Sequence, residues 1–194
     1  MSYGTAYANS SPPSPPIIDP RRFGQGMAII RIFFGLIIFA NGLAKLDAGW
    51  AQIDVGVYHA NLITRDGARN ILNFETNQRQ VKNKPNGTQV PYLKRFVNNV
   101  ILAHWNIFQW FTIGIEVGAG ALLILGLTTR LAALADFGQQ IFLALVYASS
   151  NRWLFEQPHE YVPLIALMLV PAGRVWGIDA LLVRASDRWR RWPF

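Results

Sequence analysis

Four stretches of this chain are almost continuously apolar, and each is long enough to cross a lipid bilayer. They cover residues 23–46, 107–127, 131–149 and 161–183. A helix needs about 20 residues to span the hydrocarbon layer of a membrane. A helix on the surface of a soluble protein would show polar residues at every turn, and these stretches do not. The pattern therefore predicts an all-α integral membrane protein, a four-transmembrane-helix bundle over residues 23–183.

The segments outside the four spans differ from one another in composition. Residues 1–22 form a proline-rich tail, and residues 184–194 form a basic tail that alternates arginine with tryptophan. The long loop at 47–106, between the first two spans, carries many charges of both signs. Within this region, apolar positions recur at helical spacing over residues 91–110 and predict an amphipathic helix. The polar, Pro-Asn-Gly-containing stretch at 75–91 predicts a turn or a hairpin.

The distribution of basic residues predicts how the bundle is oriented, because short cytoplasmic loops are enriched in lysine and arginine. With four spans, both termini and the second loop lie on one side, and that side carries Arg21, Arg22, Arg130, Arg184, Arg188, Arg190 and Arg191. The third loop offers only Arg152 against Glu156 and Glu160. We therefore expect a multi-pass protein of the cell inner (cytoplasmic) membrane, with cytoplasmic termini and an extracytoplasmic loop at 47–106. The tryptophans that we expect to anchor it at the lipid interfaces are Trp105, Trp110, Trp189 and Trp192.

Composition supports a membrane protein and removes several kinds of chemistry. Hydrophobic residues make up 52% of the 194 residues and charged residues 15%, and the mean hydropathy is +0.20. A soluble domain would carry about 25% charged residues. The chain has no cysteine, so disulfides, iron–sulfur clusters and covalently attached c-type haem are excluded. The net charge of +7 resides mainly at the ends of apolar segments, which favours lipid headgroups over nucleic acid. The three histidines lack metal-ligand spacing, so no metal site is expected.

Charged and amide side chains inside the predicted spans are the candidate functional residues. A charge at the centre of a membrane helix costs roughly 3 kcal/mol on insertion scales, so each such residue needs a partner or a function. The cluster that we select contains Arg31, Lys45, Glu116, Asp136, Gln140 and Arg174. Glu116 lies near the middle of its span, whereas Arg31 and Asp136 lie about 6–8 Å below the cytoplasmic boundary. We expect Arg31 or Arg174 to balance Glu116.

Two interpretations of this polar cluster remain open. It is either a structural salt-bridge network that locks the four helices together, or the lining of a pocket for a quinone headgroup, a proton or an anion. No catalytic residue is assigned in either case. Glycines at intervals of about one turn should let the helices approach closely, and the ones that we select for this role are Gly35, Gly42, Gly114, Gly118 and Gly120.

Three motifs within these spans resemble those of the DoxX family of small four-helix membrane proteins. The first is "RIFFGLIIFANGLAKL", and the second is "EVGAGALLILGLTTRLAAL". The third, "PAGRVWGIDALL", is similar to a closing Gly-x-Gly-Arg-x-x-x-x-Asp pattern, with Pro171 where the family often has glycine. The residues that carry the resemblance are Arg31, Gly42, Lys45, Glu116, Gly120, Gly126, Leu127, Thr129, Arg130, Gly173, Arg174 and Asp179.

The resemblance extends to the DoxD-type small subunit of thiosulfate:quinone oxidoreductase. It implies a small integral-membrane subunit of a redox or energy-transducing complex that is linked to quinone and electron transport. Larger complex subunits would then be partners, contacted through the 47–106 loop and the 1–22 tail. The alternative is a purely structural accessory subunit that stabilises a photosynthetic or respiratory supercomplex. Without cysteine or a covalent cofactor, the chain is not expected to be an enzyme by itself.

Overall fold

The computed structural model describes residues 19–46, 51–81, 84–85, 87–150, 156, 158–191 and 193. Most of the expected 1–22 tail, part of the 47–106 loop and Trp192 lie outside the described residues.

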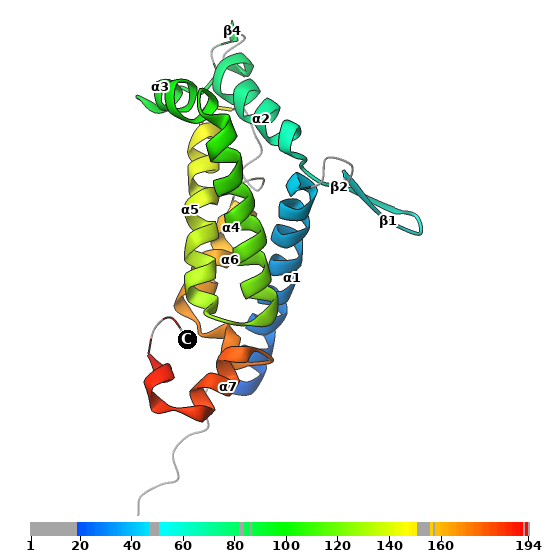
Figure 1. Cartoon of the computed structure of the whole chain (residues 1–194), viewed down its shortest axis with the longest axis vertical. Coiled ribbons are helices and arrows are strands. Elements are labelled where there is room, and N and C mark those ends of the chain that lie inside the picture. Colours follow the sequence, from blue (N-terminus) through cyan, green and yellow to red (C-terminus); the bar gives the residue numbers. More distant parts are fainter. Residues whose placement is uncertain are drawn as a thin grey trace, which may run out of the picture.

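Four helices run side by side and form the body of the molecule (Figure 1). They are α1 (Pro20–Leu46), α4 (Trp105–Leu125), α5 (Thr129–Tyr147) and α6 (Pro158–Leu169). The first three agree with the predicted spans to within three residues at each end. The end of α4 follows from Gly126, whose φ of 65° allows the left-handed conformation that closes a helix. Hydrophobicity alone therefore located the long helices correctly.

The fourth predicted span, residues 161–183, is not one continuous helix. It is divided into α6, the short 3-10 turn η3 (Ala172–Arg174) and α7 (Ile178–Ala185), followed by η4 (Asp187–Arg190). Pro171 lies directly before η3, and a proline lacks the N–H group that would continue the helix. The 12 residues of α6 have a length of about 18 Å, which is short of a full hydrocarbon crossing.

Close contact between α1 and α4 depends on glycine. A Cβ atom added to Gly35 would lie 2.8 Å from the backbone nitrogen of Ile124, and one added to Gly120 would lie 2.6 Å from that of Phe39. A Cβ atom on Gly42 would lie 2.8 Å from the backbone nitrogen of Val117. The two helices are thus antiparallel and packed backbone to backbone, as small residues permit. Gly35, Gly42 and Gly120 thus lie where any side chain would meet the backbone of the other helix.

A second body of structure covers one end of the four helices, and we call it the cap (Figure 1). Its antiparallel hairpins β1–β2 and β3–β4 add strands that the all-α prediction did not contain, although the second confirms the hairpin expected at 75–91. The helical region expected at 91–110 is α3 and η2, which lead into α4. The cap elements are β1 (Gln52–Val55), β2 (Tyr58–Asn61), α2 (Arg65–Asn73), η1 (Phe74–Gln78), β3 (Gln80–Val81), β4 (Lys84–Pro85), α3 (Leu93–Phe96) and η2 (Val97–Leu102).

The cap has its own apolar core and is tied to the bundle. Leu72, Val97, Ile101, Trp105 and Val146 are buried together, so the core joins α2, η2, α4 and α5. Trp105 is only 9% exposed and is a core residue, which corrects its expected position at the lipid interface. At the end of α5, the Ser150 hydroxyl donates a 2.6 Å hydrogen bond to Glu75 of η1.

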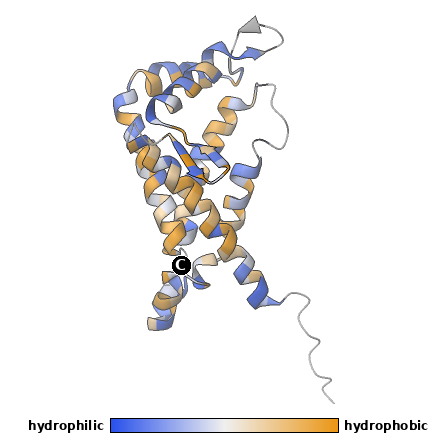
Figure 2. Cartoon of the chain, turned by 90° about the vertical axis from the view of Figure 1, so that its right-hand side faces the viewer, coloured by the Kyte–Doolittle hydropathy of each residue, from blue (hydrophilic) through white to orange (hydrophobic). Residues whose placement is uncertain are grey.

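Two of the described helices, α1 and α4, are long and apolar enough to cross a membrane. Figure 2 shows hydrophobic colours along the long helices and more hydrophilic colours in the cap and at the opposite end. That opposite end, which we call the tail end, contains the start of α1, the α4–α5 turn and α7 (Figure 1). The orientation was predicted from seven basic residues, and all of them belong to segments at this tail end. They are Arg21, Arg22, Arg130, Arg184, Arg188, Arg190 and Arg191.

Candidate functional site

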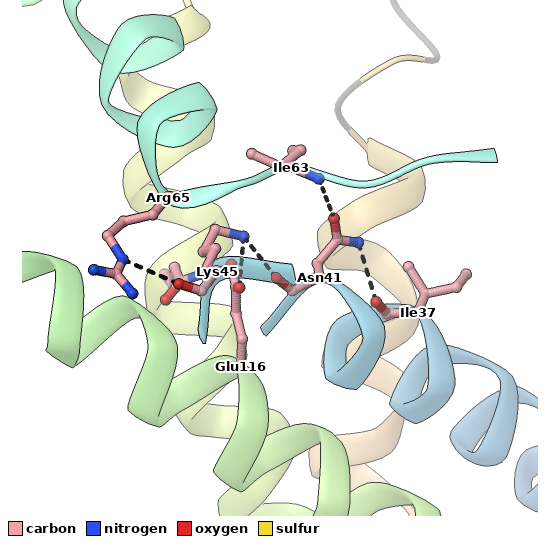
Figure 3. Close-up of polar contacts among 7 residues, drawn as sticks. Ile37, Asn41, Lys45, Ile63, Arg65 and Glu116 are labelled. Carbon is pink, nitrogen blue, oxygen red and sulfur yellow. Dashed lines mark hydrogen bonds and ion pairs between the residues drawn. The ribbon is translucent and has the colours of Figure 1, made fainter. Parts of the chain in front are cut away.

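The central feature of the site is a buried ion pair between α1 and α4. Lys45 Nζ lies 2.6 Å from Glu116 Oε2, and the side chains are 5% and 10% exposed (Figure 3). Lys45 Nζ also donates a 3.3 Å hydrogen bond to the carbonyl of Asn41, one turn earlier on α1. The expectation that Arg31 or Arg174 balances Glu116 is therefore wrong. The antiparallel register explains the difference, because the packing of Gly42 against Val117 places the last turn of α1 beside Glu116.

Residues at the edge of the cap hold this end of α1 in place. Arg65, at the start of α2, donates hydrogen bonds of 3.1 and 3.2 Å to the carbonyls of Lys45 and Leu46, as a cation at a helix C-terminus should (Figure 3). Its guanidinium also lies over the ring of Trp110, 5.3 Å from the centroid. The Asn41 side chain accepts a 3.0 Å hydrogen bond from the backbone N–H of Ile63. Arg65 and Asn41 were not among the predicted site residues, since the sequence gives no signal for such contacts.

Helix α5 adds amide and carboxyl groups to the pair. Gln139 Nε2 donates a 2.9 Å hydrogen bond to Glu116 Oε1, so both carboxylate oxygens of Glu116 have partners. Asp136, one turn earlier, is fully buried and interacts electrostatically with Glu116. The side chain of Gln140 lies beside the Asp136 carboxyl group. Lys45, Glu116, Asp136, Gln139 and Gln140 thus form one group, which we call the central cluster.

Asp136 differs from Glu116 in how its oxygens are satisfied. Among the residues that the structure describes, neither carboxylate oxygen of Asp136 meets hydrogen-bond geometry, and neither does Gln139 Oε1. Buried polar atoms without partners are costly, so these three oxygens are available to a proton or to a polar ligand.

A second buried group lies at the tail end and contains Arg31. The fully buried Arg31 donates a 3.0 Å hydrogen bond from Nη2 to the carbonyl of Trp176, and it interacts electrostatically with Asp179. Asp179, also fully buried, accepts hydrogen bonds from the backbone N–H groups of Thr128, at 2.8 Å, and Thr129, at 3.3 Å. Thr128 and Trp176 have φ values of 46° and 53°, which are strained for residues other than glycine. Arg31 and Asp179 therefore hold strained backbone in place, apart from the central cluster.

The remaining predicted residues lie elsewhere. Arg174 Nη2 donates a 2.6 Å hydrogen bond to the carbonyl of Arg190 at the exposed tail end, and Trp189 belongs to the adjoining turn η4. Trp110 is 53% exposed, as an interfacial residue would be. Cβ atoms added to Gly114 and Gly118 would meet nothing within 4 Å in the described part of the chain. These two glycines therefore make no close helix contact inside the chain, which corrects the expected packing role.

The helical bundle and its cap end each have a hollow. An apolar groove of about 690 Å³ runs between α4 and α5, with Gly114, Gly118 and Ala135 in its lining. A cavity of about 600 Å³ lies at the cap end, where Glu75, Tyr147, Glu156, His159 and Glu160 contribute to its wall. Within the described residues, no group of three or more His, Asp or Glu side chains could hold a metal ion.

Fold and site together define a helical membrane protein with a buried charged cluster. The DoxX family matches residues 80–148, a segment that includes α3, η2, α4 and all of α5. The match confirms the DoxX resemblance and covers Glu116, Asp136, Gln139 and Gln140. No solved structure matches the chain.

Proposed function

We propose that this DoxX-like membrane protein is a small subunit of a quinone-linked membrane complex, in which the central cluster binds and passes protons at a quinone headgroup. The observation that carries the proposal is the charge balance of the cluster. The central cluster holds two buried carboxyl groups, Glu116 and Asp136, and one cation, Lys45, which pairs with Glu116. An uncompensated charge in this environment is costly, so one carboxyl group is expected to hold a proton.

The chemistry of the cluster fits a quinone. A quinone headgroup offers carbonyl oxygens and, when reduced, hydroxyl groups, and its reduction consumes protons. A protonated Asp136 would be a donor to a carbonyl, whereas Gln139 Oε1 would accept a hydrogen bond from a hydroxyl. The apolar α4–α5 groove, in which Gly114 and Gly118 leave open space, suits the hydrophobic tail of such a molecule. In this proposal the quinone carries the electrons, and this chain supplies the protons and the orientation.

The test is substitution within the native complex. Glu116→Gln and Asp136→Asn preserve side-chain shape and remove one titrating group each. Both should abolish or greatly slow quinone-dependent electron transfer while the complex still assembles. Asp187→Asn, at a side chain that is 86% exposed, is the matched control and should leave turnover unchanged. Normal turnover in both cluster variants would contradict the proposal.

A purely structural accessory role is the second candidate, and the Lys45–Glu116 pair favours it. Removing one partner of a buried ion pair of 2.6 Å between α1 and α4 destabilises the bundle whether or not the pair reacts. In that case Glu116→Gln should lower the amount of assembled complex, and the complexes that remain should turn over normally. The two candidates therefore differ in turnover per assembled complex, measured after native electrophoresis of a mild-detergent extract. The larger subunits that co-migrate would be the partners of the chain.

The proposed topology has four membrane segments, cytoplasmic termini and an extracytoplasmic cap in the cell inner membrane. Because the chain has no cysteine, single-cysteine variants report topology without background. Val57→Cys, at a 98% exposed position in the cap, should react with a membrane-impermeant thiol reagent in intact spheroplasts. Arg188→Cys at the tail end should react only after the membrane is permeabilised. Labelling of both in intact spheroplasts would contradict this topology.

A further inference from the structure

A proton that binds a buried carboxyl group of the central cluster needs a path from water, and the cap-end cavity is a candidate for the start of that path. Its lining comes from α2, η1, the end of α5 and the start of α6, so it lies where the cap meets the bundle. Glu75, Glu156, Glu160 and His159 all contribute to the wall. None of the described lining residues is a lysine or an arginine.

The acidity of this cavity is notable in a basic protein. The chain has a net charge of +7, yet three of its eleven acidic residues line this one cavity. A cavity that is lined by one sign of charge and has low-dielectric walls raises the concentration of counterions within it. The described His, Asp and Glu side chains form no group that could hold a metal ion. The proton is the cation that carboxylates and a histidine can receive one at a time.

Helix α6 carries Glu160 of the cavity wall and packs against α5, which carries Asp136 of the central cluster. Glu160 of α6 interacts electrostatically with Asp136 of the adjoining helix α5. Asp136 in turn interacts with Glu116 of α4, which is paired with Lys45 of α1. Gln140 lies beside Asp136 on the same helix. Asp136 is thus fully buried, short of hydrogen-bond partners within the described residues, and electrostatically linked to a carboxyl group of the cavity wall.

We infer that the cap-end cavity is the aqueous entrance through which protons reach Asp136, with Glu160 as the relay. In this step, hydronium gives its proton to the Glu160 carboxylate and leaves as water. Glu160 then passes a proton to the Asp136 carboxylate and returns to its charged form. No oxidant or reductant takes part. The inference rests on the proposed function in that it treats Asp136 as a proton-binding group, but it does not require a quinone.

The test follows hydrogen–deuterium exchange at Asp136 in the purified full chain, reconstituted in lipid nanodiscs. The infrared C=O band of a protonated carboxyl group shifts on deuteration, and its loss in Asp136→Asn assigns the band. Glu160→Gln keeps the shape of the relay and removes its proton-carrying group. It should slow the exchange by at least about tenfold, a low value for loss of a positioned acid–base group.

A second variant tests the cavity without altering any charge. Ile71→Trp enlarges an apolar wall residue and should also slow the exchange, because it fills the cavity. The matched control is Asp66→Asn, an exposed acid on α2 that is not part of the wall, and it should exchange as the unmodified chain does. Circular dichroism would show that each variant is folded.

Two results would overturn the inference. One is equal exchange rates in the unmodified chain, Glu160→Gln and Ile71→Trp, which would mean that protons reach Asp136 by another path. The other is the lack of any Asp136 acid band from alkaline to acidic pH, which would mean that Asp136 binds no proton. The quinone proposal is tested separately by electron transfer in the native complex. Slowed exchange with normal electron transfer in Glu116→Gln and Asp136→Asn would leave the entrance standing and remove the quinone role.

Discussion

Lys45 on α1 and Glu116 on α4 form an ion pair of 2.6 Å inside the helical bundle. The pair lies one turn beyond the contact of Gly42 with Val117, so the glycine packing sets which cation Glu116 can reach. Gln139 satisfies the second carboxylate oxygen, at 2.9 Å. Glu116 is therefore held by α1 and α5 together, and any change to it acts on both helix contacts.

Loss of the lysine should be more damaging than loss of a surface cation. Lys45→Met leaves Glu116 without its cation, and breaking a buried ion pair by removing one partner costs about 3–5 kcal/mol. We expect a clear fall in the thermal unfolding midpoint of the purified chain in detergent. Arg95→Met, at an exposed position of the cap, is the control and should change the midpoint little. An equal effect of the two substitutions would show that the pair contributes no stability.

Neighbouring glycines of α4 should respond in opposite ways to the same substitution. Gly120→Ala places a methyl group against the backbone of Phe39, so we expect a destabilisation of about 1–3 kcal/mol. Gly118→Ala meets open space and should be neutral or stabilise the helix by up to about 1 kcal/mol. Thermal unfolding of the two variants side by side measures the difference. If Gly118→Ala were the more damaging in the isolated chain, the α1–α4 register described above would be wrong.

The long helices could be predicted from the sequence because hydrophobicity depends on each residue and its near neighbours. The predicted spans at 107–127 and 131–149 lie within two residues of α4 and α5. The partner of Glu116 could not be predicted in this way, because it depends on the register of two helices that are separated by residues 47–104 of the chain. Depth alone grouped Arg31 with Asp136. In the structure, Arg31 interacts with Asp179 at the tail end, and Asp136 with Glu116.

The break in the fourth span shows a similar limit. A proline such as Pro171 can end a helix, but it does not indicate that the chain turns back to place Asp179 at the start of α5. That contact requires Gly126, whose carbonyl accepts a 2.9 Å hydrogen bond from the backbone N–H of Asp179. The family motifs marked both residues without showing that they touch. Local patterns therefore identified the residues of this group, and only the folded chain shows their geometry.

Asp179 should be important for stability and not for proton transfer. It accepts hydrogen bonds from the N–H groups of Thr128 and Thr129 and faces the charge of Arg31. Asp179→Asn should cost about 1.5–3 kcal/mol, the range for hydrogen bonds to a charged group. The loss should be smaller when Arg31→Met is already present, because the two residues interact. A double-mutant cycle on thermal unfolding measures this coupling, and simple additivity would contradict it.

Arg65 should join the cap to the bundle through its geometry as well as its charge. Its guanidinium donates to the carbonyls of Lys45 and Leu46 and lies 5.3 Å from the centre of the Trp110 ring. Arg65→Ala should therefore lower the free energy of unfolding by about 1–2 kcal/mol. Arg65→Lys keeps the charge but not the planar fork, so it should recover only part of the loss.

The control for Arg65 is Arg69→Ala, which removes the same charge from an exposed position of the same helix. It should change the unfolding midpoint little. A double-mutant cycle of Arg65→Ala with Trp110→Leu isolates the ring contact, for which we expect a coupling of about 0.5–1 kcal/mol. Full recovery by Arg65→Lys, or no coupling to Trp110, would show that only the charge at the end of α1 matters. Partial recovery with coupling would show that Arg65 also fixes α2 against α4, beside the last turn of α1 that carries Lys45.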